Sequence, residues 1–188
     1  VAVFTNTNYN PSLAVRTPYP VEKIDFDLSG TYSAYNWELF FHIPLLIATH
    51  LSKNQQFSEA QKWFHYIFDP TKSTDDPTQG MERFWRPQPF KDEILNEVLT
   101  IDQLLDGVDP MELNAQLNSW HNNPFNPHAV ARIRISAYMR NTVMRYIDNL
   151  IAWGDQLFQR DTLESINEAT LLYILVANTL GRKPTIIP

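Results

Sequence analysis

Cysteine is absent from this sequence of 188 residues, and glycine occurs only five times. The lack of cysteine excludes disulfide frameworks, thiolate zinc sites and cysteine nucleophiles. None of the glycines forms the glycine-rich loop that binds phosphate groups. The HExxH motif of zinc proteases and the GxSxG motif of serine hydrolases are also missing. These absences remove the common sequence signatures of an enzyme, so we expect no catalytic residue, no metal site and no cofactor.

Positive charge is scarce as well, because 15 Lys and Arg residues face 21 Asp and Glu residues, which gives a net charge of −6. Nucleic acid is therefore not an expected partner, since phosphate binding needs a basic face. No apolar run reaches the ~20 residues that span a bilayer. The hydrophobic fraction of 44% and the aromatic fraction of 13% predict a folded domain with a real core. The chain starts at Val1 without a signal peptide, which predicts a trimmed part of a longer chain, with a processed mature protein as the alternative.

The first thirty residues differ from the rest in their pattern. Pro11, Pro18 and Pro20 disfavour regular helix, and residues 21–28 alternate apolar and polar side chains with the period of a strand. Residues 1–30 are therefore predicted to be an extended or β lead-in. From Tyr32 onward the apolar residues recur every three or four positions, which is the helical period. The fold class predicted is mainly α, a bundle of antiparallel helix pairs.

The first predicted helix pair covers residues 32–68. Pro44 lies inside the first apolar face and is expected to kink or split that helix. Ser58 is predicted to cap the second helix, with Gln61 as its capping-box partner. This hairpin looks like a single tetratricopeptide repeat, so an autonomous helical protein-interaction module is the alternative function. No second copy follows at a period of ~34 residues.

Further helices are predicted at 92–106, at 109–112 and onward, at 137–160 and at 161–180. Asp161 and Glu164 are expected to form the capping box of the last helix, and Gly181 its left-handed C-cap. Because the connection between the last two helices is short, they are predicted to pair antiparallel. Residues 71–90 are predicted to be a loop that carries an aromatic cluster.

Candidate chemistry is sparse, and for each candidate a structural role is the favoured interpretation. His65 and Asp69 have the i, i+4 spacing of metal ligands on a helix, and a metal-dependent hydrolase at His65 is the enzyme hypothesis they allow. Two acid pairings, Glu38 with His42 and Asp155 with Asp161, lack the arrangement that general acid–base catalysis demands. Glu38 lies among aromatic residues and is expected to need a partner if it is buried. The remaining histidines are His50, His121 and His128, and the arginines that can pair with acids are Arg132, Arg134, Arg140 and Arg145.

Tryptophan and phenylalanine at helical spacing are more often core or interface than a ligand-stacking box. Residues 123–128 (NPFNPH) place two prolines around one phenylalanine, which predicts a rigid corner that packs this ring into the domain. The residues predicted to pack are Trp37, Phe41, Trp63, Phe64, Phe68, Phe125, Trp153 and Phe158.

Several long, aromatic-rich blocks resemble the A component of the bacterial Tc insecticidal toxin complexes. They are 35–42 (YNWELFFH), 60–70 (AQKWFHYIFDP), 123–128 (NPFNPH), 146–158 (YIDNLIAWGDQLF) and 160–170 (RDTLESINEAT). The resemblance runs from about residue 24 to residue 181. It implies a secreted virulence factor, a homopentameric, pore-forming A subunit that translocates the cargo carried in the B–C cocoon. Residues 31–183 would belong to its helical shell, and residues 184–188 to the start of the linker that leads to the channel.

The same resemblance implies which partners this segment has. They are other parts of the same long A chain and neighbouring A subunits, whereas the B–C cocoon and the host membrane are reached only through the assembly. The receptor-binding regions and channel helices have no counterpart among these residues. The resemblance therefore implies a scaffold and an anchor, and it carries over no catalytic residue.

Overall fold

The computed structural model describes residues 12–15, 24–26, 30–72, 80–95, 118, 121–122, 125 and 135–181. The chain divides into two compact units, Val1–Trp37 and Glu38–Pro188. Regular structure in the described residues is helical apart from one isolated β-bridge, which confirms the mainly α prediction. Most of the predicted extended lead-in, the helix predicted at 109–112, and residues 184–188 lie outside the described residues.

The first unit contains helix α1 (Ser33–Trp37), which is held by two backbone carbonyl groups that precede it. Asn36 Nδ2 donates a hydrogen bond to the carbonyl of Asp25 at 2.6 Å, and Trp37 Nε1 donates to the carbonyl of Phe26 at 3.2 Å. The rings of Phe26 and Trp37 meet edge to face at 5.5 Å. A buried indole requires a partner for its N–H group, and the 24–26 segment supplies it.

The second unit opens with a π-helix, η1 (Glu38–His42), followed directly by α2 (Ile43–Lys53). Pro44 stands in the first turn of α2, where its missing N–H group costs little. The kink or split predicted at Pro44 is not seen as a break, because residues 33–53 are continuously helical. The helix changes instead from the wide π turn to the α turn just before the proline.

Helix α3 (Phe57–Phe64) returns from α2 through a turn in which Gln55 has a left-handed backbone, with φ of 61°. The prediction that Ser58 caps this helix is wrong, because the helix already begins at Phe57 with Gln56 at the cap position and no side-chain cap. The start is fixed by packing instead. Phe57 is buried, and Asn149 Nδ2 of a later helix donates to its carbonyl at 3.3 Å.

After α3 the chain pairs briefly with the segment that precedes the next helix. Phe68 and Trp85 form an antiparallel bridge, in which Asp69 N donates to the carbonyl of Phe84 at 2.8 Å and Arg86 N to the carbonyl of Ile67 at 2.9 Å. This bridge connects α3 to the 3-10 helix η2 (Met81–Phe84) and to α4 (Gln88–Leu95). Helix α4 starts at Gln88, so the predicted loop ends earlier than expected.

The longest helix is α8 (Ile135–Phe158), and α9 (Leu163–Leu180) folds back on it. The pairing of the last two helices is confirmed, but the predicted capping box is wrong by one residue. Thr162 is the N-cap and Ser165 its partner, with the backbone N–H of Ser165 bonded to Thr162 Oγ1 at 3.2 Å. Asp161 lies in the turn before the N-cap, with a φ of 52°. Gly181 has a positive φ of 74° but a ψ of −165°, which is not the left-handed helical cap predicted.

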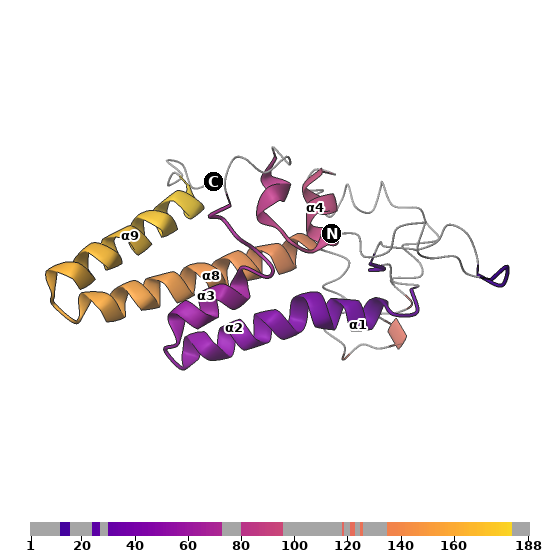
Figure 1. Ribbon diagram of the computed structural model, residues 1–188, viewed down its shortest axis with the longest axis horizontal. Coiled ribbons are helices and arrows are strands. Elements are labelled where there is room, and N and C mark those ends of the chain that lie inside the picture. The colour runs from indigo at the N-terminus through magenta and orange to yellow at the C-terminus, as the bar shows by residue number, and fades with distance from the viewer. Residues whose placement is uncertain are drawn as a thin grey trace. The chain divides into compact units, whose positions relative to one another are not determined.

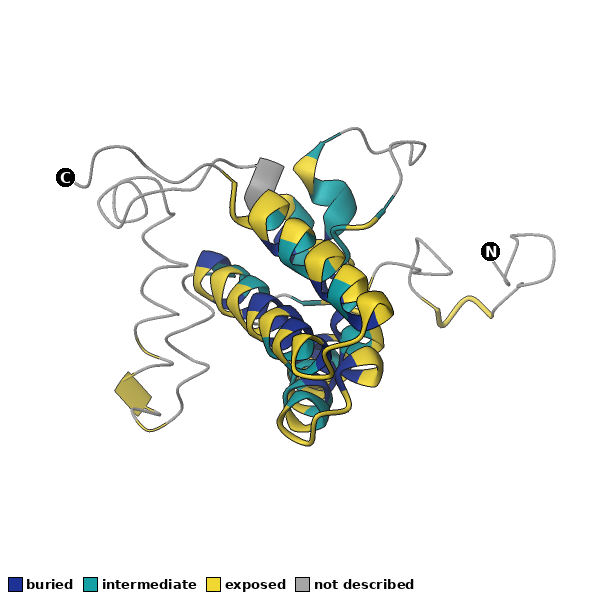
Figure 2. Ribbon diagram, turned by 90° about the vertical axis from the view of Figure 1, so that its left-hand side faces the viewer, coloured by how far each residue is buried: buried dark blue, intermediate teal, exposed yellow. Residues whose placement is uncertain are grey.

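The packing of the second unit has α8 at its centre. Helix α3 packs between α2 and α8, α9 packs along α8, and α4 packs near the first turns of α8 (Figure 1). Buried residues face one another along the paired helices, and exposed residues cover their outer sides (Figure 2). The α2–α3 and α8–α9 hairpins together confirm the predicted antiparallel helix pairs.

Candidate functional site

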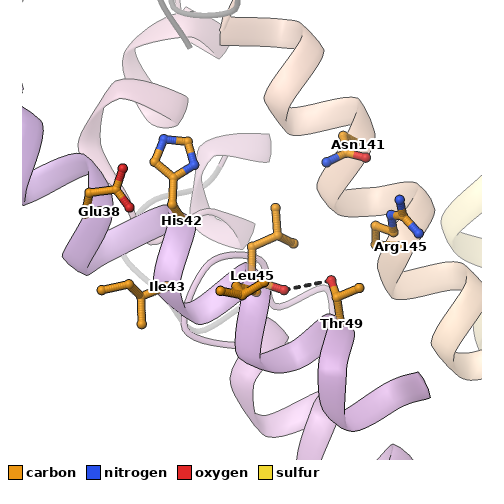
Figure 3. A pocket seen from close by; sticks show the side chains of 8 residues that line it. Glu38, His42, Ile43, Leu45, Thr49, Asn141 and Arg145 are labelled. Carbon is orange, nitrogen blue, oxygen red and sulfur yellow. Dashed lines mark hydrogen bonds between the residues drawn. The ribbon is translucent and has the colours of Figure 1, made fainter. Parts of the chain in front are cut away.

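A cavity of about 400 Å³ lies between η1 and α2 on one side and α8 on the other. Glu38 and His42 come from the π-helix, one behind the other along its axis, and Asn141 and Arg145 face them from α8 (Figure 3). Ile43, Leu45, Leu46 and Thr49 of α2 complete the lining. Thr49 Oγ1 donates to the carbonyl of Leu45 at 2.7 Å and so adds no free donor to the cavity.

Glu38 was expected to need a partner only if it is buried, and the structure does not bury it. Glu38 is exposed, so its carboxylate keeps its hydration and needs no partner. His42 is half-buried and packs against the rings of Phe41, at 4.8 Å, and Tyr138, at 5.5 Å. Glu38 and His42 line the same cavity. Its other lining residues include no second carboxylate, and the one hydroxyl group among them, that of Thr49, already donates to Leu45.

A second polar cluster lies where α3 meets α8, around the hydroxyl group of Tyr146. Gln61 Nε2 donates to this oxygen at 3.3 Å, and His65 Nε2 lies 3.3 Å from it. His65 Nε2 is 3.9 Å from Asp69 Oδ1, and Arg86 Nη2 is 3.8 Å from Asp69 Oδ2. Tyr146 is fully buried, and a buried hydroxyl group requires hydrogen-bond partners. Gln61 and His65 supply them.

Burial controls the protonation of this cluster. It lowers the pKa of His65, against the opposing effect of the Asp69 carboxylate and with a smaller contribution from Arg86. Burial likewise raises the pKa of Tyr146, although the hydrogen bond from Gln61 works in the other direction. The cluster is thus a neutral imidazole beside a neutral phenol at pH 7.

The metal-ligand spacing of His65 and Asp69 does not produce a metal site. Asp69 Oδ1 accepts hydrogen bonds from Thr71 N at 3.1 Å and Thr71 Oγ1 at 2.7 Å, which commits the carboxylate to the turn after α3. Across the described ranges, no three His, Asp or Glu residues lie close enough together to hold a metal ion. The cluster's chemistry is that of hydrogen bonds that connect two helices.

The other predicted chemical residues are dispersed. Asp155 accepts a hydrogen bond from the hydroxyl group of Tyr173 at 2.7 Å, which connects α8 to α9 rather than pairing it with Asp161. His50, His121 and Arg140 are exposed. His128, Arg132, Arg134 and Trp120 lie outside the described residues.

The residues predicted to pack fall into three groups in the structure. Trp37, Phe41, Phe64 and Phe68 are buried, each with at most 6% of its surface exposed. Trp63 and Trp153 are half-buried. Phe125 and Phe158 are 97% and 58% exposed, so the described residues do not give these two the internal packing expected of them. Phe158 is the last residue of α8, where Leu157 turns to the core in its place.

An aromatic network joins elements that are far apart in the sequence. Phe41 of η1 meets Phe90 of α4 at 5.1 Å and Tyr138 of α8 at 4.9 Å. From Phe90 the contacts continue through Trp85 and Phe68 to Tyr146, at 5.2, 4.8 and 5.8 Å. Tyr138, Tyr146 and Phe90 were not among the residues predicted to pack. The helical period of 137–160 is the signal that could have found Tyr146, which flanks the apolar residues recurring along that helix, whereas no pattern singled out Tyr138.

Comparison with known proteins finds some that are similar to this chain, by sequence and by structure. The chain matches no protein-family model. It is 25% identical over 162 residues to the toxin subunit YenA2 of Yersinia entomophaga, which covers 85% of this chain and 10% of YenA2. The cryo-EM structure of TcdA4 from Morganella morganii superimposes with a TM-score of 0.59 and 32% identity, over 87% of this chain and 6% of TcdA4.

Both matches extend over most of this chain and over a small part of a much longer protein. YenA2 and TcdA4 are A components of Tc toxins, which is the family that the sequence blocks resemble. The chain is therefore a relative of the Tc toxin A components and corresponds to a segment of about a tenth or less of the length of these two.

Proposed function

We propose that this chain is a structural segment of the helical outer shell of a Tc toxin A subunit, and that it anchors the linker to the channel. In this proposal residues 31–183 form the shell domain, residues 1–30 lead into it, and residues 184–188 begin the linker. The observation that carries the proposal is the relationship itself, which joins 25% identity over 162 residues to YenA2 with a TM-score of 0.59 to TcdA4.

Uncovered apolar surface on the outer sides of the helices supports a shell role. Met144, Ile151 and Phe158 recur every seven residues along α8 and are 52%, 38% and 58% exposed. On α9, Leu171 and Ile174 are 67% and 51% exposed. These rows put several exposed apolar side chains on one side of each helix, and exposed apolar surface that exceeds single scattered residues marks sites that bind other proteins. In a shell segment they would pack against neighbouring parts of the same long chain or against adjacent A subunits.

The internal connections support a rigid anchor. The Tyr173–Asp155 hydrogen bond and the Thr162–Ser165 capping box fix α9 to α8 and to the turn between them. The aromatic network fixes the first turns of α8 to η1 and α4. Since α9 ends at Leu180, a chain that leaves this helix starts from a position held by all of these contacts.

The proposed setting is a secreted, insecticidal homopentamer that forms a pore in the target-cell membrane and translocates its cargo. In it, catalysis belongs to the cargo, and membrane insertion belongs to other parts of the A subunit. Within the ranges that the structure describes, no helix has the length and apolar character to cross a membrane. This segment would meet the B–C cocoon and the membrane only through the assembly.

The test places these residues in a complete A subunit. We expect Phe41→Ala, which removes a fully buried ring, to increase cleavage by protease, to lower the fraction of assembled pentamer in size-exclusion chromatography, and to reduce pore currents after a pH shift. Phe40→Ala, on the neighbouring ring that is 38% exposed, is the matched control. If Phe41→Ala leaves both assembly and pore currents unchanged, these residues are not the scaffold proposed.

A further inference from the structure

The cavity at the π-helix continues into a second one along the same two helices. This second cavity, of about 260 Å³, is lined by Ser52, Lys53 and Phe64 on one side and by Asp148 and Ala152 on the other. Thr49 and Arg145 line both cavities. The two hollows are therefore one groove, called here the α2–α8 groove, with Thr49 and Arg145 at its middle.

The groove has the dimensions and periodicity of a helix-binding surface. Its α8 wall consists of Asn141, Arg145, Asp148 and Ala152, at the i, i+4, i+7 and i+11 positions of one helical face. The eleven helical steps from Asn141 to Ala152 extend ~17 Å, or about three turns. A partner helix that lies along such a groove anchors itself with side chains at the same i, i+3, i+4 and i+7 positions.

Apolar side chains border the groove and are exposed in the part of the chain that the structure describes. Leu39, Ile43 and Leu46 follow one another at spacings of four and three residues and are 59%, 43% and 59% exposed. Ile43 and Leu46 are also lining residues of the first cavity. An occupant with an apolar stripe would cover this row, whereas a polar small molecule would leave it in water.

Charge determines the chemical character of that occupant. Arg145 is exposed and stands at the middle of the groove, and the described residues give it no ion-pair partner. Glu38 lies at one end, and Lys53 and Asp148, of opposite sign, lie together at the other. The centre of the groove is thus positive while its ends are negative or balanced, and a carboxylate at the middle of an occupant matches it.

We propose that the α2–α8 groove binds an amphipathic α-helix of a partner polypeptide, whose apolar stripe covers Ile43 and Leu46 and whose central Asp or Glu pairs with Arg145. The proposal rests on the proposed function for the source of this helix, a neighbouring part of the toxin shell. The groove, its apolar border and its central arginine are properties of this chain alone.

The test measures binding of three lactam-bridged helical peptides of about 18 residues to the 188-residue chain by fluorescence polarisation. The peptides share one leucine stripe and differ only at a central position, which is Glu, Gln or Lys. We expect affinity to decrease in that order, with about a tenfold ratio between the Glu and Lys peptides at low salt. Arg145→Glu should reverse the order, because the exposed charge changes sign without a change in the core.

Two tryptophan substitutions locate the binding surface. Thr49→Trp fills the middle of the groove and should weaken binding of all three peptides. Thr170→Trp adds the same ring at an exposed position of α9 and should leave binding unchanged. Thermal unfolding of each variant, followed by circular dichroism, shows that it is folded.

The proposal is overturned if the order of affinities is the same with Arg145 and with Arg145→Glu, if a folded Thr49→Trp variant binds as the unmodified chain does, or if none of the peptides binds. These results concern peptide binding by the 188-residue chain. The shell proposal is tested separately, by the assembly and pore currents of Phe41→Ala in the complete A subunit. Failure of the groove proposal is therefore distinguishable from failure of the shell proposal.

Discussion

At Gly154 of α8 the ring of Tyr173 from α9 lies close to the helix backbone, and replacing the glycine with alanine tests this close contact. A Cβ atom built on Gly154 would lie 2.8 Å from Cε1 and 2.9 Å from Cζ of Tyr173. The hydroxyl group of the same tyrosine donates to Asp155, the next residue along α8, at 2.7 Å. The ring thus lies across the glycine and is held at its far end, so the added methyl group forces the ring to shift.

Two opposing effects decide the outcome of Gly154→Ala. Alanine is favoured over glycine in a helix interior by about 0.8–1.0 kcal/mol. Against this, the Tyr173 ring must move away from the added methyl group, which gives up its hydrogen bond, worth about 1 kcal/mol, and its packing against α8, worth about 1 kcal/mol more. We expect the steric effect to exceed the propensity by about 1 kcal/mol. In a chain of this size that lowers the melting temperature by roughly 2–4 °C.

The assay is urea unfolding of a double-mutant cycle made of Gly154→Ala, Tyr173→Ala and the two together. Once the ring is removed, Gly154→Ala should stabilise the chain by about 1 kcal/mol, because only the helix propensity remains. The coupling between the two positions is then about 2 kcal/mol. If Gly154→Ala stabilises the chain equally with and without the Tyr173 ring, α8 and α9 do not approach closely here and the reasoning fails.

Further predictions concern the core, the cap and the His65 cluster. Phe90→Ala should lower the free energy of unfolding by about 3–5 kcal/mol in urea titrations, since the ring is fully buried, whereas Phe158→Ala should change it by less than about 0.5 kcal/mol. Thr162→Ala should cost about 1 kcal/mol through loss of the capping box, and a melting temperature equal to that of Thr170→Ala would contradict this. Because the folded-state pKa of His65 is lowered, the unfolded chain binds more protons, and stability should fall as pH decreases below about 6.5. His65→Gln should flatten that part of the pH profile, and an unchanged slope would remove His65 as its cause.

The helical period predicted the long hairpin of α8 and α9 because each helix buries side chains that recur at helical spacing. Ile147, Leu150 and Leu157 are such residues of α8, and Ala169 and Val176 are such residues of α9. Helix starts were predicted less well. Gln55 and Asp161, two residues with positive φ, lie in the turns directly before the starts of α3 and α9. The sequence shows whether a residue tolerates a left-handed backbone conformation. It does not show that the residue adopts this conformation, because that depends on how the helices on either side pack.

The aromatic network lay beyond sequence reasoning for a different reason. Phe41, Phe90 and Tyr138 come from three elements separated by long stretches of chain, and no local period indicates that such residues meet. The cavity at Glu38 and His42 depends in the same way on α8, which brings Asn141 and Arg145 opposite them. Sequence patterns identified which residues of α2 share a face, but only the fold shows that α8 forms the other wall.

The sequence of α9 shows why an apolar pattern predicts burial without predicting the partner. Ala169 and Val176 are buried on the face toward α8, but Leu171 and Ile174 form a second apolar face that is more than half exposed. A helix that is apolar on two faces is typical of a position between two layers of protein. Each of these half-covered side chains stands to gain about 1–2 kcal/mol from full burial, and the described residues supply no surface that provides it. The second face therefore contributes little to the folding of this segment, and its free energy is available for association with a neighbouring surface.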